Sequence, residues 1–431
     1  MTSRLNTGRS ASTRRHSERK ADPIPASFRY FQNLNTDVGV RVAAFTGRFV
    51  SGSLTLPDDV ARELGSDRAR GDVLSDALVD AAFAGGWSRR LHGMVDQALD
   101  HGIDSVADAP AELVALFGHL DAQPDWLDWA RVERGAQVLR RYGVDAFYYF
   151  GLISLEGYRV EMIHRPLVLT GTYTGGTAFG RYLETCRFWL DTSEPGGLRP
   201  GAAGRKAAVS VRVMHSMIRR KVAAHPEWDA DRLGVPLSQN SQMGPITLSF
   251  VINQHAKLIG YWPSDAEILD HMHLWRYIGY LMGIEPSYYP ETIEDWWRLT
   301  YLMFSMDSPA DGDDSRRLSQ SFVAAFGPTA RDDRETRRRK AREQRTVLGW
   351  TRFFLTEETF TANQLPTPAP WQRWLPLLRL PGNLRDELGR RLLPAYAARL
   401  DERKRRERRT WLEGHSGGGQ ARFTPVDKLA G

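Results

Sequence analysis

The fold is decided by a stretch with helical periodicity, Ala207-Ala-Val-Ser-Val-Arg-Val-Met-His-Ser-Met-Ile-Arg-Arg220. Positions three and four apart are neighbours on a helix, so Ala208, Val211, His215 and Ile218 share one face. Segments on both sides of this stretch have the same spacing, and almost none alternates apolar and polar residues with period two. We therefore predict an all-α fold.

Further helices are expected before and after this stretch. Segment 73–83 has the same apolar spacing, and Gly85-Gly86 then ends it. The apolar segment 144–155 is too short to cross a bilayer and is typical of a core helix. The other helices are expected at about 178–193, 205–224, 242–258, 265–283 and 291–306.

The chain is predicted to divide into four segments. Residues 1–25 are a basic tail rich in Ser, Thr and Arg, and we expect them to be disordered. Residues 26–306 form the main helical domain. Residues 307–411 form a helical carboxy-terminal extension, in which 307–316 reads as a polar loop and 331–345 as a run of mixed charge. Residues 412–431 are a second disordered tail.

Composition excludes several classes of protein. The single cysteine, Cys186, allows neither an internal disulfide nor a cysteine-rich zinc site, and its apolar neighbours favour a small buried residue. Arg14-Arg15 is not followed by an apolar stretch, and no apolar run of roughly 18 residues occurs. A cytoplasmic protein without a transmembrane segment is expected.

The net charge of +6 is concentrated in basic runs near both ends, which we interpret as solvated faces or tails; no nucleic-acid partner is expected. The 13 tryptophans either wall a deep pocket or fill a large core.

His215 is the most informative histidine. It places one imidazole within an apolar helical stripe, which suits an axial ligand of haem iron, although the spacing alone favours a core histidine that bonds to a backbone carbonyl. On the preceding helix, Arg181, Glu184, Thr185 and Phe188 share a face. They form either a polar wall above a cofactor or an ordinary exposed ion pair between Arg181 and Glu184.

Other candidate sites are weaker. His271 and His273 are two residues apart, so on a helix they point in different directions and do not form a chelate. The segment 161–164 is a single Glu-x-x-His, whereas a di-iron bundle needs two. The glycine-rich segment 171–176 lacks the lysine of a phosphate loop and reads as a connection between helices.

Several motifs, in this order and spacing, resemble a known family: Leu167-Val-Leu-Thr-Gly171, Arg181-Tyr-Leu-Glu-Thr185, Val211-Arg-Val-Met-His215, Gly234-Val-Pro-Leu-Ser-Gln239 and Trp275-Arg-Tyr-Ile-Gly-Tyr-Leu-Met-Gly-Ile284. The chain is similar to the catalytic domain shared by the latex clearing proteins (rubber oxygenases) and the MpaB oxygenase of mycophenolic acid biosynthesis. The resemblance covers roughly residues 80–305.

The resemblance implies a globin-like helical core with additional flanking helices, a haem b, and oxidative cleavage of isoprenoid double bonds by dioxygen. It assigns His215 as the iron ligand and Arg181 and Thr185 as polar groups on the opposite face of the haem. Glu184 stands where the rubber-cleaving members carry lysine, so it either acts as a base or pairs with Arg181. Glu161 lies in the neighbourhood of the family's separate acidic base. Because no export signal is expected, a smaller unsaturated isoprenoid or lipid-like substrate is favoured over rubber.

Two other functions stay open from the sequence. One keeps the fold and the haem but is non-catalytic: a sensor, a storage protein or an electron carrier. The substitution of glutamate for lysine at position 184 keeps this alternative open. The other is a haem-free helical scaffold whose basic tail binds a polyanion, with strongly salt-dependent association.

Overall fold

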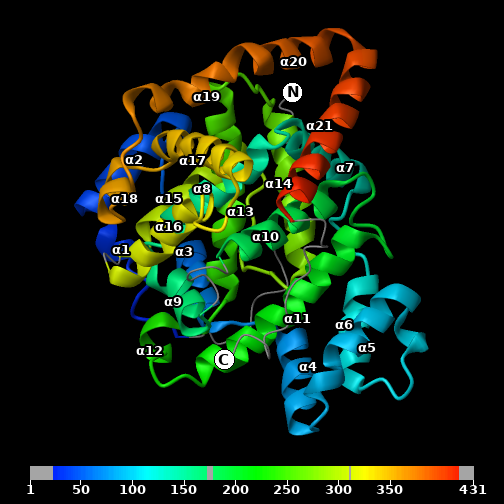
Figure 1. Cartoon of the computed structure of the whole chain (residues 1–431). Helices are drawn as coiled ribbons and strands as arrows, with labels where there is room; N and C mark the ends of the chain where they lie inside the picture. The colour runs from blue at the N-terminus through cyan, green and yellow to red at the C-terminus, as the bar shows by residue number, and fades with distance from the viewer. Residues whose placement is uncertain (1–22, 172–177, 310–311, 417–431) are drawn as a thin grey trace, which may run out of the picture.

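Helices supply all the regular structure of the described part of the chain (Figure 1). The computed structural model describes residues 23–171, 178–309 and 312–416, and within these ranges it has no strand. The all-α prediction is thereby confirmed. Most of both predicted tails and most of the glycine-rich segment 171–176 lie outside the described residues.

The first third of the chain forms α1 to α7, which span Tyr30–Asn33, Asp37–Thr46, Asp58–Ser66, Val73–Ala84, Ser88–His101, Ala111–Asp121 and Trp129–Arg141. The predicted end of α4 is confirmed: Gly85 is its carboxy-terminal cap, and Gly86 has the left-handed φ of +70° that favours glycine. Helices α4, α5 and α6 pack together at the lower right of Figure 1, where α4 also contacts α11.

The middle of the chain forms α8 to α15, which span Asp145–Gly157, Glu161–Leu169, Ala178–Ser193, Ala203–Ala223, Ala230–Leu233, Gln239–Leu258, Asp265–Leu281 and Ile293–Ser305. All the helices expected in this region are present, and α10 begins and ends where it was predicted to. Helix α8 buries residues on every side, as a core helix does.

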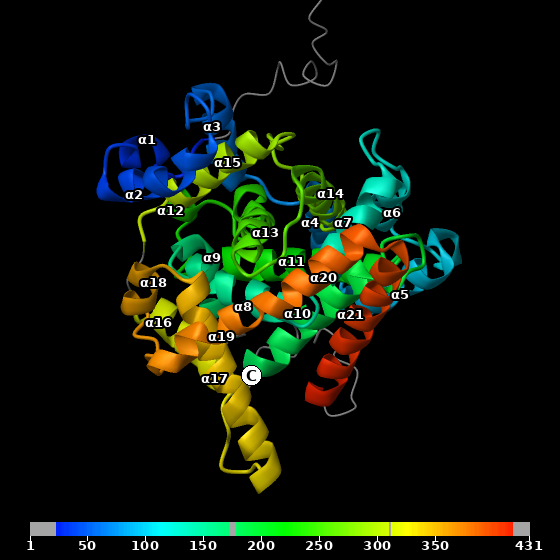
Figure 2. The same ribbon diagram turned by 90° about the horizontal axis from the view of Figure 1, so that it is seen from above.

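The core is built around α13, which lies in the middle of both ribbon views (Figures 1 and 2) and packs against α8, α14 and α15. Its Phe250 is fully buried and stacks on Trp296, with the ring centroids 5.7 Å apart. Trp296, Trp297 and Trp350 are among the largest fully buried side chains. These indoles therefore fill the core, the simpler of the two uses expected for the tryptophans.

The carboxy-terminal part forms α16 to α21, which span Asp313–Ala325, Arg334–Phe354, Glu357–Ala362, Leu375–Leu378, Leu380–Leu392 and Pro394–His415. These helices pack on α7, α8, α9 and α10. The prediction of a polar loop over 307–316 is wrong from Asp313 onward. Asp313 and Asp314 occupy the first turn of α16, where acidic side chains favour the helix, and each pairs with an arginine three residues later.

The basic run 399–409 is part of α21 and not merely a solvated surface. Arg408 is fully buried, and its Nη2 donates hydrogen bonds to the carbonyl oxygen of Trp189 at 3.0 Å and to the Ser193 hydroxyl at 2.8 Å. These bonds hold α21 against the end of α10. In the part of the chain that the structure describes, no helix is both long and apolar enough to cross a membrane.

Candidate functional site

The site residues predicted from the sequence lie on α10 and α11, which pack against each other. The connection between the two helices is tight because it uses glycine at close contacts. A Cβ atom added at Gly204 would lie 2.5 Å from the carbonyl oxygen of Asp191 and 2.6 Å from that of Gly197. Only glycine allows the start of α11 to approach the end of α10 this closely.

His215 lies on α11, partly buried, with a fixed hydrogen bond on one side of its ring. Its Nδ1 is 2.9 Å from Oε1 of Gln242 on α13. The amide nitrogen of Gln242 donates to the carbonyl oxygen of Leu237 at 2.9 Å, so its oxygen is the atom that faces the imidazole. Nδ1 therefore carries the proton and donates it to Gln242.

The opposite ring atom, Nε2, consequently keeps its lone pair. Burial lowers the pKa of His215 to about 4, so the ring is neutral at pH 7. No hydrogen bond to Nε2 is formed within residues 23–171, 178–309 and 312–416. The partner of Nδ1 is a side-chain amide and not the backbone carbonyl expected of a core histidine, and the assignment of His215 as an iron ligand stays a prediction. The structure leaves a neutral nitrogen donor oriented by a second residue.

Buried arginines on both sides of His215 anchor α11. Arg212 makes a bidentate ion pair with Asp72, at 2.6 and 2.8 Å. Arg219 pairs with Asp76 and donates to the carbonyl oxygen of Leu237 at 2.8 Å. Since Leu237 also accepts from Gln242, these bonds connect α4, α11 and the start of α13 and hold the imidazole in place.

Gln242 and these ion pairs were not identified from the sequence. Gln242 lies 27 residues after its partner, and no local pattern marks it. Asp72 gave no signal as the partner of Arg212 because the two are 140 residues apart. The network depends on how α4, α11 and α13 pack.

On α10, the structure brings the three predicted polar residues together. Arg181 Nη1 is 2.7 Å from Glu184 Oε2, and the Thr185 hydroxyl donates to the carbonyl oxygen of Arg181 at 3.0 Å. The expectation of an ordinary exposed pair is wrong: the pair forms, but Arg181 is only 8% exposed and Glu184 only 9%. A buried pair of this kind is stable only because each charge neutralises the other.

The weaker candidates have structural contacts. His271 is buried with both ring nitrogens engaged, accepting from the indole of Trp275 at 3.0 Å and bonding to Asn253. His273 accepts from the backbone amide of Asp128. Glu161, considered as an acidic base, makes two 2.7 Å bonds to Arg232.

Cys186 is fully buried, and burial raises the pKa of its thiol well above its usual value, as expected for a small inert core residue.

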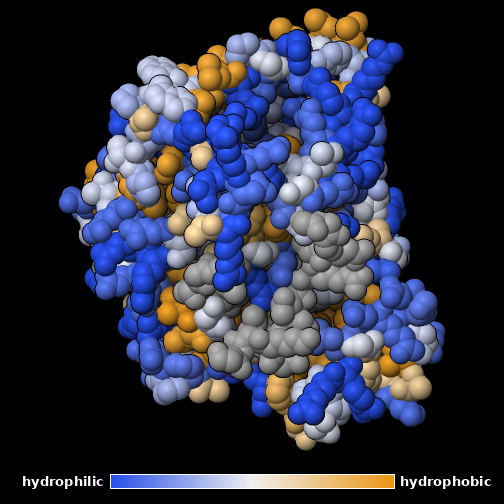
Figure 3. Space-filling model, in the orientation of Figure 1, coloured by the Kyte–Doolittle hydropathy of each residue, from blue (hydrophilic) through white to orange (hydrophobic). Residues whose placement is uncertain are grey.

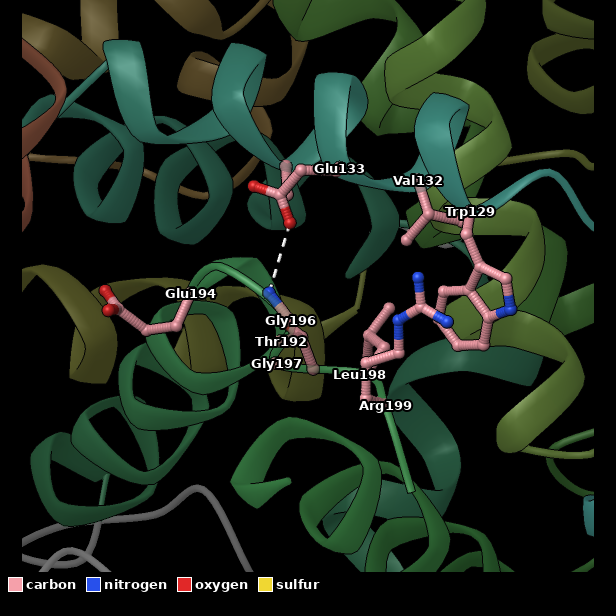
Figure 4. A pocket seen from close by; sticks show the side chains of 10 residues that line it. Trp129, Val132, Glu133, Thr192, Glu194, Gly196, Gly197, Leu198 and Arg199 are labelled. Atoms are coloured by element: carbon pink, nitrogen blue, oxygen red, sulfur yellow. Dashed lines mark hydrogen bonds between the residues drawn. The ribbon is translucent and has the colours of Figure 1, made fainter. Parts of the chain in front are cut away.

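A small cavity of about 170 Å³ lies beside the α10–α11 connection (Figure 4). Glu133 on α7 accepts a hydrogen bond from the backbone amide of Gly196 there, and the guanidinium of Arg199 lies 3.9 Å from the ring centre of Trp129. None of the predicted site residues lines it. Its volume is below that of ordinary ligand pockets, so we regard it as part of the turn rather than as the site.

A haem iron needs one protein nitrogen with a free lone pair, an oriented ring and apolar neighbours. His215 supplies the first two, and the partly exposed Met214 and Ile218 flank it on the same helix. Among the described residues no group of three or more His, Cys, Asp and Glu side chains is placed to hold a bare metal ion. The donor set therefore fits haem better than a free metal.

Comparison with known proteins gives the family of the chain. Residues 140–414 match the family described as "ER-bound oxygenase mpaB/B'/Rubber oxygenase, catalytic domain". The chain belongs to this family. The match includes α10, α11 and α13, and it continues through α16 to α21, which form the predicted carboxy-terminal extension. The earlier resemblance, by contrast, stopped near residue 305.

Two individual proteins are similar to this chain. The rubber oxygenase of Streptomyces sp. (strain K30) is 26% identical over 210 residues, which are 48% of this chain and 48% of that protein. The matched segment thus spans about half of the relative. A solved structure of a latex clearing protein in the closed state aligns with a TM-score of 0.61 and 18% identity, covering 79% of this chain and 91% of that one. At that identity the likeness shows a common fold.

Proposed function

We propose that this protein is a haem b-dependent oxygenase that uses dioxygen to oxidise or cleave an unsaturated isoprenoid or lipid-like small molecule. The observation that carries the proposal is the neutral His215 ring, with Nδ1–H donated to Gln242 and the Nε2 lone pair available. Membership of an oxygenase family supports the reaction class.

In this proposal each residue has a distinct role. His215 holds the haem iron through Nε2, and Gln242 is a positioning residue that fixes the tautomer and direction of the ring. The haem supplies the oxygen chemistry when it is bound. Arg181 and Thr185 provide polar hydrogen atoms on α10, and Met214 and Ile218 provide apolar neighbours on α11.

Glu184 limits how far the chemistry of the rubber-cleaving relatives carries over. Its ion pair with Arg181 leaves the two buried side chains with no net charge, whereas arginine and lysine together would carry +2. To act as a base, Glu184 must separate from Arg181 or transfer a proton while still paired. A substrate that arrives with a polar group able to compete for Arg181 satisfies this requirement.

The same ion pair favours a second candidate, a haem protein that binds dioxygen or another small ligand without cleaving an alkene. With Arg181 and Glu184 engaged by each other, neither is positioned for proton transfer in this state. Consumption of dioxygen in the presence of an alkene distinguishes the two functions.

The test begins with absorption spectra of haem-loaded protein, wild type beside His215→Ala and Gln242→Leu. The proposal predicts a strong Soret band in the wild type, its loss or shift in His215→Ala and weaker loading in Gln242→Leu. The wild type should then consume dioxygen with squalene or geranylgeraniol. Absence of a Soret band in a correctly folded wild type refutes the haem assignment, and a Soret band without turnover of any alkene supports the second candidate.

A further inference from the structure

Helix α20 turns Leu388 and Leu392 to the solvent, whereas its polar residues, together with Leu380 and Leu384 beside Gly260, face the protein. Its buried residues are Asn383, Asp386 and Glu387. Leu388 and Leu392, on the opposite side, are exposed, Leu392 by 74%. A surface helix of a globular domain normally shows the reverse arrangement.

This orientation is held by specific contacts. Asn383 donates to the carbonyl oxygen of Ile259 at 2.8 Å, and Asp386 accepts from the hydroxyl of Tyr396 at 2.6 Å. Glu387 pairs with Arg390 and Arg391 at 2.5 and 2.7 Å. The Glu387 pairs lie within α20, but rotating the helix to bury Leu388 and Leu392 would break the bonds of Asn383 and Asp386 to Ile259 and Tyr396. The outward position of these two leucines is therefore a fixed feature of the fold.

The apolar face continues through α19 and the short 3₁₀ helix that precedes it, Pro370–Trp374. Trp374 is 63% exposed and Leu378 72%. Of the 15 large hydrophobic side chains exposed in the described residues, seven lie between positions 371 and 393. Figure 3 shows hydrophobic atoms gathered along the top edge, where Figure 1 draws α19 and α20. Such a concentration marks an interaction surface.

Arginines outnumber acidic residues in the segment that carries this face. Residues 366–399 contain six arginines and two acids, and both acids are the buried Asp386 and Glu387. Arg379 and Arg385 are exposed and also line an adjoining cleft of about 910 Å³, in which five basic side chains meet three acidic ones: Arg379, Arg385, Arg403, Lys404 and Arg406 with Asp145, Asp386 and Glu407. Tryptophan, leucine and arginine on one face are typical of elements that lie in the headgroup region of a membrane.

We propose that the face formed by residues 371–393 docks onto the surface of a bilayer that contains anionic lipids. The leucines and the two indoles enter the boundary between headgroups and acyl chains, and the arginines contact lipid phosphates. The α20 axis lies in the plane of the membrane, and among the described residues no helix is long and apolar enough to cross it. This docking does not depend on haem, and it would bring the enzyme to the phase in which an apolar alkene concentrates.

The test uses the full-length protein and sedimentation with vesicles of 70% phosphatidylcholine and 30% phosphatidylglycerol. The probe variant is Leu388→Glu/Leu392→Glu. The matched control, Val73→Glu/Val114→Glu, makes the same changes at exposed positions of α4 and α6, at the other end of the molecule (Figure 1). We expect binding to fall about tenfold or more in the probe variant and to stay within about twofold in the control.

The bound fraction should also fall in pure phosphatidylcholine vesicles and in 0.5 M salt, because the arginines contribute electrostatically. Circular dichroism and thermal melting of both variants check that the fold is kept. The proposal is overturned if the wild type does not sediment with the anionic vesicles, or if the probe and control variants bind equally. It is also overturned if light scattering shows a wild-type dimer that only the probe variant disrupts while vesicle binding is absent, since the face would then join two copies of the chain.

Discussion

Replacing Gln242 by leucine removes the acceptor that orients His215 while keeping the size of the side chain. The Nδ1–H of a partly buried imidazole then loses its 2.9 Å bond, and the carbonyl oxygen of Leu237 loses one donor. Leaving a buried polar group without a partner costs about 1–3 kcal/mol. Loss of the residue that orients a metal ligand lowers affinity by roughly 10- to 100-fold, equivalent to about 1.4–2.7 kcal/mol. The two magnitudes agree, so we expect haem to bind about 10- to 100-fold more weakly.

The assay is transfer of haem from the loaded protein to an excess of a high-affinity acceptor apoprotein, followed by the shift of the Soret band. Gln242→Glu restores an acceptor for Nδ1–H and is expected to keep affinity within about fivefold of the wild type while lowering the iron reduction potential, because the ligand becomes more basic. Gln97→Leu, at an exposed position of α5, controls for the general effect of this substitution. Wild-type retention of haem by Gln242→Leu would refute the positioning role of Gln242.

Three further changes test the neighbouring structure. Burial lowers the pKa of His215 from 6.5 to about 4, so the unfolded chain binds the proton more readily than the folded protein. The neutral ring should therefore add at most about 3 kcal/mol to the free energy of unfolding of the apoprotein in urea. This contribution is complete above pH 6.5, lost between pH 6.5 and 4, and absent in His215→Gln. Arg181→Gln and Glu184→Gln should each lower the free energy of unfolding, and the sum of the two losses should exceed the loss in the double variant by about 1–3 kcal/mol. A difference near zero would mean that the pair is not formed in solution. Gly204→Ala should lower stability by about 2 kcal/mol or more and weaken haem binding, because the added Cβ meets backbone atoms. Gly180→Ala, with open space around it, should be neutral or stabilising by up to about 1 kcal/mol. Equal melting temperatures for the two variants would contradict the close contact at Gly204.

The sequence determined the helices because their signals are local. The apolar spacing around His215, the cap at Gly85 and the apolar segment of α8 each depend on residues within a few positions of one another. The same locality placed Arg181 and Glu184 on one face of α10. The prediction of a loop was wrong at the start of α16, where capping acids and short-range ion pairs outweighed the absence of apolar residues.

Tertiary structure decided what the local patterns left open. An apolar stripe leaves the hydrogen-bond partner of His215 undetermined, because that partner is Gln242, whose helix is brought beside α11 only by folding. The Arg181–Glu184 pair is buried because other elements cover α10, which no pattern within α10 indicates. Likewise, the periodicity of α20 defines two faces, but it is the contacts with Ile259 and α21 that turn the polar face inward. Helical periodicity reports which residues share a face, whereas the partner that each face meets is set by chain segments far away in the sequence.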